Sequence, residues 1–188
     1  MQCHEWCFTH AERDLRTVAH VDDFLLSGEL YDLLWFRDKL LEKYELKVQV
    51  AGWDREDDKE LSFLGRVLRL TPTGIELEGD DKHVGLLEEE WGMINCNPVP
   101  TPYVKTTASL RDVVGGAEAK AMSPADATLY RRAAVRINYV ALDRPDLRFA
   151  SRVASSCMSN PKEGDDMIIK RIIRHLKGKP RVAIRYKF

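Results

Sequence analysis

The period of the hydrophobic pattern changes part-way along the chain, and this change limits the possible folds more than any other feature. Within residues 1–79, short segments alternate apolar and polar side chains, as half-buried strands do. From about residue 80 onward, apolar residues recur at steps of three and four, which is typical of helices with one buried face. Strands that precede helices, instead of alternating with them, favour an α+β fold. We therefore expect a small antiparallel sheet over 1–79, and three to four helices with a final strand over 80–188.

Two acidic residues stand between apolar segments near the start of the chain. Strands are expected at 7–10 and 15–21, and the apolar pattern resumes after Asp22 and Asp23 as Phe24-Leu25-Leu26. Two β-rich segments with a short polar connection are typical of a hairpin. The sequence therefore predicts a hairpin that carries both carboxylates at its tip.

One helix and further strands are expected in the rest of this first part. Ser27 is a candidate N-cap for that helix. The helix is expected to bury one face, formed by Leu30, Leu33, Leu34, Leu40, Leu41 and Tyr44. Alternation predicts strands at 46–50, 61–70 and 75–78, with an acidic loop at 54–60.

The second part carries clear helix starts and stops. Asp80 is a candidate cap for a helix over 82–93, and residues 103–122 are interpreted as a surface loop. The segment Ser123-Pro124-Ala125-Asp126 combines a hydroxyl N-cap, a proline at the first helical position and an acid at the third. The later helices are predicted from apolar stripes at Tyr130, Ala134, Ile137 and Ala141, at Ala150, Val153, Ala154 and Cys157, and at Ile168, Ile169, Ile172 and Leu176. A last strand is expected at 181–186.

Charge is divided unevenly along the 188 residues. Residues 1–130 carry 14 Lys and Arg against 25 Asp and Glu, a net charge of −11, whereas residues 131–188 carry 15 against 5, a net charge of +10. A basic C-terminal part is suited to a polyanion, and two oppositely charged surfaces of one protein can also pair with each other. Charge alone therefore leaves both interpretations open.

Neither a membrane nor a secreted protein is expected from the pattern. No apolar run approaches the ~20 residues that span a bilayer, and the start lacks the features of a secretion signal. An intracellular protein is expected, in which four cysteines stay unpaired. Cys3, Cys7 and His10 loosely resemble a zinc knuckle, but no second ligand pair follows at the required distance. Terminal thiols with no special role are the preferred interpretation.

Asp22 and Asp23 are the residues best suited to chemistry. Mg²⁺ prefers oxygen ligands, and a bound ion neutralises the repulsion between adjacent carboxylates. In two-metal phosphoryl transfer, one ion activates the attacking hydroxyl and the other stabilises the leaving oxygen. Adjacent acids are also common in ordinary turns, so the pair taken alone favours a plain turn.

The surrounding sequence reverses that preference. The segment His20-Val21-Asp22-Asp23-Phe24-Leu25 resembles the Tyr-Val-Asp-Asp motif of reverse transcriptases. Further blocks resemble the copia-type retrotransposon branch of that family, in the same order along the chain. They are Lys43-Tyr44-Glu45-Leu46-Lys47, Phe63-Leu64-Gly65, Thr73-Gly74-Ile75, Val99-Pro100-Thr101-Pro102, Tyr130-Arg131-Arg132, Asn138-Tyr139-Val140, Arg144-Pro145-Asp146-Leu147-Arg148-Phe149-Ala150, Met158-Ser159-Asn160-Pro161 and Lys170-Arg171-Ile172-Ile173-Arg174-His175-Leu176-Lys177-Gly178.

The resemblance implies the end of a polymerase palm, over 1–79, followed by a helical thumb or connection segment. It makes Asp22 a metal ligand with Asp23 beside it, Mg²⁺ the cofactor, and an RNA or DNA template–primer and dNTP the partners of the complete enzyme. Basic residues of the last helix would then contact phosphates, independently of nucleic-acid sequence: Lys170, Arg171, Arg174, Lys177 and Lys179. For each of them a solvated helix face is the alternative, and Arg144 with Asp146 is interpreted as an ion pair or a helix cap.

Two departures from the family pattern bear on activity. His20 stands where the family has tyrosine, close to the expected catalytic centre. In the family the third catalytic carboxylate lies on an earlier palm strand, so this chain is expected to be a fragment that does not polymerise alone. The predicted function is RNA-directed DNA polymerisation by two-metal nucleotidyl transfer in the complete parent. The alternative is a non-catalytic nucleic-acid-binding or interaction module derived from a decayed retroelement. A third interpretation is a fragment without a selected function, whose start at Met1 is a gene-calling artefact.

Overall fold

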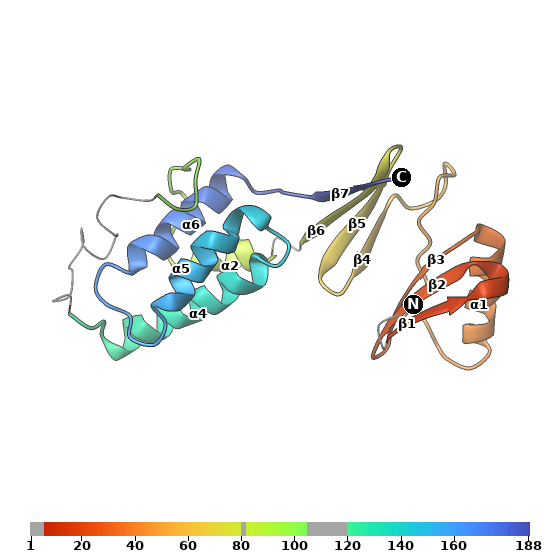
Figure 1. Ribbon diagram of the computed structural model, residues 1–188, viewed down its shortest axis with the longest axis horizontal. Coiled ribbons are helices and arrows are strands. Elements are labelled where there is room, and N and C mark those ends of the chain that lie inside the picture. The colour runs from red at the N-terminus through yellow and green to blue at the C-terminus, as the bar shows by residue number, and fades with distance from the viewer. Residues whose placement is uncertain (1–5, 80–81, 105–119) are drawn as a thin grey trace. The chain divides into compact units, whose positions relative to one another are not determined.

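The structure is a computed structural model that describes residues 6–79, 82–104 and 120–188. The chain divides into two compact units, residues 1–75 with 187–188, and residues 76–186. Strands predominate in the first unit and helices in the second (Figure 1), so the α+β expectation is confirmed. The assignment of these regions to a palm and a thumb stays a prediction.

A three-stranded antiparallel sheet with one helix beside it opens the first unit. The strands pair in the order β1-β2-β3. The elements are β1 Cys7–His10, a 3-10 turn Ala11–Arg13, β2 Leu15–His20, β3 Asp23–Ser27 and α1 Leu30–Leu41. Arg13 fastens α1 to the sheet, because it pairs with Asp32 at 2.5 Å and lies 4.0 Å over the Trp35 ring. The predicted hairpin of β2 and β3 is confirmed.

Helix α1 differs from the expectation in its start and in its burial. Its N-cap is Glu29, not Ser27, because Ser27 still belongs to the paired strand β3. Gly28 follows at a point where a β-carbon would lie 2.5 Å from the Leu15 side chain. No residue of α1 is buried, and the helix ends before Tyr44, which is exposed. The prediction of a buried leucine face is therefore wrong.

Two of the predicted strands take another form. Residues 46–50 are not a strand, and there the Gln49 side chain, not a backbone ladder, bonds to Asp58 and to the Glu60 carbonyl. Residues 61–70 form two strands instead of one. Leu64 and Gly65 adopt φ of 50° and 68°, and such a pair of positive φ values makes a two-residue hairpin turn.

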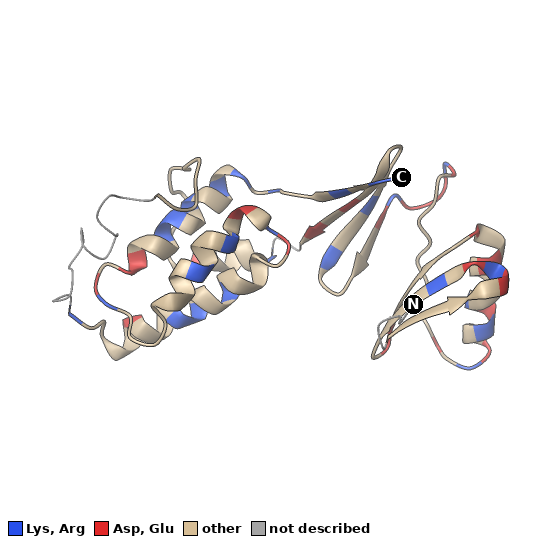
Figure 2. Cartoon of the chain, in the orientation of Figure 1, with Lys and Arg blue, Asp and Glu red and all other residues tan. Residues whose placement is uncertain are grey.

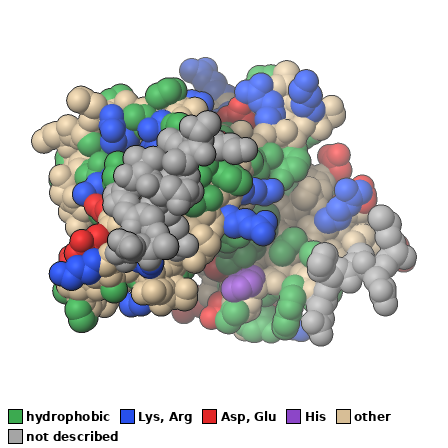
Figure 3. Space-filling view, turned by 60° about the vertical axis from the view of Figure 1, so that its left-hand side comes forward, with side chains coloured by type: hydrophobic (Ala, Val, Ile, Leu, Met, Phe, Trp, Pro, Cys, Tyr) green, Lys and Arg blue, Asp and Glu red, His purple; other side chains and the backbone are tan. Residues whose placement is uncertain are grey.

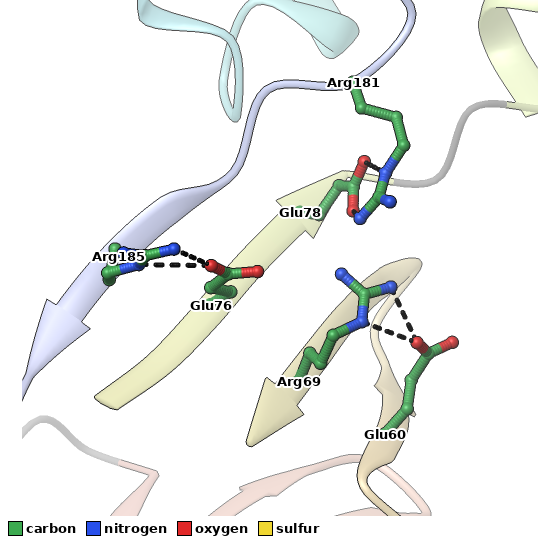
Figure 4. Close-up of polar contacts among 6 residues, drawn as sticks. All are labelled: Glu60, Arg69, Glu76, Glu78, Arg181 and Arg185. Atoms are coloured by element: carbon green, nitrogen blue, oxygen red, sulfur yellow. Dashed lines mark hydrogen bonds and ion pairs between the residues drawn. The ribbon is translucent and has the colours of Figure 1, made fainter. Parts of the chain in front are cut away.

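A second antiparallel sheet contains this new hairpin. Its order is β4-β5-β6-β7, with β4 Glu60–Phe63, β5 Arg66–Thr71, β6 Gly74–Gly79 and β7 Ile184–Lys187. Arginine–glutamate pairs reinforce the strands (Figure 4): Arg69 with Glu60, Arg181 with Glu78, and Arg185 with Glu76. The Arg181 guanidinium donates to both carboxylate oxygens, at 2.8 and 2.6 Å, which is the strongest geometry for such a pair.

Four helices share one core in the second unit (Figure 1). They are α2 Lys82–Glu90, α4 Pro124–Val140, α5 Arg148–Ser156, which follows a 3-10 turn Pro145–Leu147, and α6 Asp166–Gly178. The fully buried residues include Tyr130, Ile137, Leu147, Ile169, Ile172, Ile173 and Leu176. The predicted stripes of α4, α5 and α6 thus form the core of this unit.

The predicted start of α4 is confirmed in detail. The Ser123 hydroxyl accepts a hydrogen bond from the Asp126 amide at 3.2 Å, and Pro124 occupies the first helical position. The predicted cap Asp80 and most of the predicted loop at 103–122 lie outside the described residues. None of the helices in the described ranges has the length and apolar character needed to cross a membrane.

Candidate metal-binding hairpin and basic helices

Asp22 and Asp23 are neighbours in the β2–β3 hairpin, but one lies in the turn and the other in a strand. His20 pairs with Asp23, so the turn consists of Val21 and Asp22, and Asp23 is the first residue of β3. Both carboxylate residues are exposed. The turn holds Val21 at φ 53° with 81% of its surface exposed. A β-branched residue seldom adopts a positive φ, and a two-residue hairpin turn is one of the places that requires it.

The register of the hairpin decides which side chains share a face. Directly paired residues of an antiparallel sheet point to the same side, so Asp23 lies with His20. Neighbouring positions alternate, and Thr17 is buried on the face opposite to that of His20. The residue that replaces the family's tyrosine therefore stands across the strand from one of the two acids.

A cleft of about 420 Å³ lies within the first unit beside the hairpin, and Asp22 and Asp23 form part of its wall. The other walls are leucines of α1, the extended segment 46–51 and the residues 61–64. Arg37 and Lys47 are the cations that line it. The cleft thus places two carboxylates at the border of a mainly apolar recess.

The described residues offer no complete metal-ligand set. No group of three or more His, Cys, Asp or Glu side chains able to hold a metal ion occurs among them. Mg²⁺ keeps several waters and is often held by one or two carboxylates together with substrate phosphates. Asp22 and Asp23 fit that partial role, and a further ligand would have to come from elsewhere.

The residues that loosely resemble a zinc knuckle do not come together in the part of the chain that the structure describes. Cys3 lies outside the described residues. Cys7 pairs with Val18 and His10 with Leu15, so the two stand three residues apart on opposite faces of β1. The His10 ring instead contacts Trp35, with 5.7 Å between the ring centroids. Cys7 and His10 therefore cannot share one ion.

Four of the five cations proposed for nucleic-acid contact make bonds within the protein. Their contacts are Lys170 to Asp166 at 2.6 Å, Arg171 to the Thr101 hydroxyl at 3.0 Å, Arg174 to the Asn97 carbonyl at 2.7 Å, and Lys177 to Glu88 at 3.3 Å. Lys179 is exposed just beyond α6. Two of these bonds hold the segment 97–101 against α6. These cations therefore have a structural role, whatever else they bind.

A buried polar network lies behind this surface. Arg144 is 5% exposed, and its guanidinium donates to both Asp146 oxygens at 3.0 and 2.9 Å, which confirms the expected pair. His175 of α6 adds a third contact, with Nε2 2.9 Å from Asp146 Oδ2. Burial raises the pKa of Asp146, but the hydrogen bonds from Arg144 and His175 and their charges outweigh it, and the pKa falls to about 2. The network joins the turn before α5 to α6.

Sequence reasoning missed the part of His175 in this network. His175 is 1% exposed and lies 29 residues from Asp146. Its position among the buried residues of α6 was the available signal, because a buried histidine needs a polar partner. The pattern along the chain does not identify that partner.

Three plant proteins resemble the chain over most of its length. The Retrovirus-related Pol polyprotein from transposon RE1 of Arabidopsis thaliana is 30% identical over 169 residues, which cover 89% of this chain. The chain is a relative of retrotransposon Pol polyproteins. The Retrovirus-related Pol polyprotein from transposon RE2 is 27% identical over 87% of the chain, and the Uncharacterized mitochondrial protein AtMg00810 is 28% identical over 86%, both from the same plant.

This Pol relative corresponds to only part of these proteins. It spans 10% of each transposon polyprotein and 60% of the mitochondrial protein. No protein-family model matches the chain, and no solved structure matches it. The resemblance to copia-type elements in the ordered sequence blocks is thereby confirmed, while the polymerase segment and its activity stay proposals.

Proposed function

We propose that the chain is the last part of the palm and the helices that follow it in an RNA-directed DNA polymerase of a copia-type retroelement. The observation that carries the proposal is the β2–β3 hairpin, with Asp22 in its two-residue turn and Asp23 beside it, both exposed along a cleft. The relationship to Pol polyproteins over most of the chain supports it. A plain turn accounts for the positive φ of Val21, because two-residue hairpins require it, but not for the ordered sequence blocks around it.

In this proposal the two acids hold Mg²⁺ for nucleotidyl transfer. Bound Mg²⁺ supplies charge for the phosphates and lowers the pKa of the attacking hydroxyl. Asp22 and Asp23 contribute oxygen ligands from a rigid hairpin, so the positions of both carboxylates are fixed before the substrate binds. A third acid, from a part of the polymerase that the described residues do not contain, completes the set. The 188-residue chain by itself is therefore expected not to polymerise.

The partners of the complete enzyme are an RNA or DNA template–primer and dNTP. The second unit would grip the duplex or its unpaired end through phosphate contacts, which depend on salt and not on sequence. Lys170 and Lys179 remain exposed on and just after α6. The ion pairs of Lys170 and Lys177 at the surface are weak enough to exchange for phosphate contacts.

A chimeric polymerase tests the proposal. The 169-residue matching segment of the RE1 polyprotein is replaced by this chain, and Mg²⁺-dependent primer extension is measured. Asp22→Asn is expected to lower extension more than the roughly 10–100-fold that even indirect metal partners cost. Glu56→Gln, in the acidic loop of the same unit, is the matched control and should leave extension unchanged. An Asp22→Asn, Asp23→Asn chimera that extends primers as well as its parent would overturn the proposal, as would robust incorporation by the 188-residue chain alone.

One observation favours the second candidate, a non-catalytic nucleic-acid-binding module. The helical unit has its own closed core and needs no catalytic segment to bury its apolar side chains. In that case the chimera would bind template without extending it, and Asp22→Asn would change neither property.

A further inference from the structure

Helix α5 has a solvent face that combines cations with an aromatic ring and contains no acid. Ala150, Ser151 and Ala154 are buried, whereas Arg148, Phe149, Arg152 and Ser156 are exposed. Steps of three and four place these exposed residues on one side of the helix. Figure 2 shows basic residues along α4, α5 and α6, with acidic residues near the helix ends.

The neighbouring arginines of this region are already engaged. Between residues 127 and 160 the chain has six arginines and two acids, Asp143 and Asp146. The engaged arginines are Arg132 and Arg136 with Glu90, Arg144 with Asp146, and Arg131 with the Met158 carbonyl. Arg148 and Arg152 make no hydrogen bond or ion pair with any residue that the structure describes. Arg148 and Arg152 are thus exposed cations whose charge is not paired with any described residue.

The cations of α6 differ from Arg148 and Arg152 in that most of them bond within the protein. Its cations Arg171 and Arg174 hold the segment 97–101, and Lys177 pairs with Glu88. A polyanion would have to compete with these bonds on α6, whereas none of the residues that the structure describes bonds to Arg148 or Arg152. On the face of the molecule drawn in Figure 3, Lys and Arg side chains are interspersed with apolar ones.

Phe149 is the aromatic residue of this α5 face. Phe149 is 62% exposed, and its ring contacts that of Tyr103, with 5.1 Å between centroids and 70° between planes. Tyr103 in turn packs against the core of the unit. An aromatic ring that is held in place, open to solvent and on the same helix face as two arginines is suited to stacking on an unpaired base.

We propose that the face formed by Arg148, Phe149 and Arg152 binds single-stranded nucleic acid, with the guanidinium groups on phosphates and the ring stacked on a base. Bases inside a duplex are stacked on each other, so only an unpaired segment can use Phe149. The choice of nucleic acid as the polyanion rests on the proposed function and deepens it. The α5 face would therefore hold the unpaired template next to the template–primer duplex.

The test measures binding of a fluorescently labelled single strand and its duplex to the full chain by anisotropy, over a series of salt concentrations. For single strands, log K falls with log salt by about 0.7 per phosphate contact, so Arg148→Ala with Arg152→Ala should reduce the slope by about 1.4. Arg148→Lys with Arg152→Lys should retain the slope. Phe149→Leu should weaken single-strand binding roughly tenfold with the slope unchanged, because it removes stacking and no charge.

A matched pair on α4 serves as control. Arg131→Ala with Arg132→Ala removes the same charge from two exposed arginines that bond within the protein, and it should leave most of the single-strand slope intact, with helix content checked by circular dichroism. The inference is overturned if the α5 double variant keeps the wild-type slope, if the α4 pair accounts for the slope, or if the chain prefers the duplex. Failure of this inference leaves Asp22-dependent extension by the chimera in place, whereas failure of the polymerase proposal would leave binding on α5 intact.

Discussion

The two units bury their apolar side chains to very different extents. The helical unit encloses a cluster in which Tyr130 and several isoleucines have no exposed surface. In the first unit Leu15 is the one buried hydrophobic residue among those described, while Trp6, Phe8 and Trp53 are each more than half exposed. The stability gained on folding grows with the apolar area removed from water, so the helical unit is expected to be the more stable.

The helical unit thus encloses its own core, whereas the first unit leaves an apolar cleft beside Asp22 and Asp23. Leucines of α1 line that cleft instead of filling it. This arrangement agrees with the proposal that the first unit is one portion of a larger palm. The second unit, in contrast, has the closed core of a domain that folds around its own residues.

Paired core substitutions should show the largest effect. Ile172→Ala in α6 removes a fully buried side chain and should lower the free energy of unfolding by about 2–5 kcal/mol, because a cavity remains. Leu33→Ala in α1, which is only half-buried, should cost about 1 kcal/mol. Urea denaturation with hydrogen exchange resolved by segment measures both. Equal costs in the two units would break the comparison.

A substitution in the buried network of the helical unit should cause the next largest loss of stability. Asp146→Asn leaves the buried Arg144 without its carboxylate and should destabilise the unit by about 3 kcal/mol. Asp166→Asn, which removes the partner of the half-exposed Lys170, is the control and should cost about 0.5 kcal/mol. Chemical denaturation of both variants is the measurement, and similar costs would contradict a special role for the network.

Acid should weaken the same network. The pKa of Asp146 is about 2 in the folded protein against 3.8 ordinarily, so its contribution is complete above pH 3.8 and is lost as the pH falls through about 2. The loss should amount to roughly 2 kcal/mol of unfolding free energy. Unfolding of wild type and Asp146→Asn across this window measures it. An acid loss of the same size in Asp146→Asn would assign the effect to other groups.

Two of the predicted helix caps, Ser123 and Ser27, should show the smallest effects. Ser123→Ala should cost about 1 kcal/mol, because it removes the bond to the Asp126 amide. Ser27→Ala should change stability by less than about 0.5 kcal/mol, since Ser27 caps no helix. Thermal denaturation compares the variants, and a larger loss at Ser27 would mean that α1 starts earlier than the structure shows.

Local signals in the sequence were sufficient for several elements. Ser123 and Pro124 start α4 through contacts within four residues, and the stripe of α6 gives its buried face directly. The turn at Leu64 was missed, because leucine at positive φ has no turn signature and the strands on both sides read as one. The burial of α1 was wrong because periodicity shows which face is apolar, not whether another segment covers it.

In the candidate site, too, features set by neighbouring residues could be predicted and long-range contacts could not. The hairpin with Asp22 and Asp23 follows from neighbouring residues, so it was predictable. The bond from Arg174 to Asn97 joins residues 77 apart, and only the folded chain reveals that this cation is occupied. Likewise, only the folded chain reveals that Arg148 and Arg152 bond to none of the residues that the structure describes, because this depends on how α4, α5 and α6 pack.

Binding of Mn²⁺, a paramagnetic substitute for Mg²⁺, to the full chain tests most directly whether the hairpin seats a cation. Nuclear magnetic resonance should show selective broadening of the amide signals of residues 20–24, and the variant carrying Asp22→Asn and Asp23→Asn should lose it. Broadening centred on the acidic loop 54–60, with the hairpin signals unaffected in wild type, would contradict the assignment of a metal site to this turn.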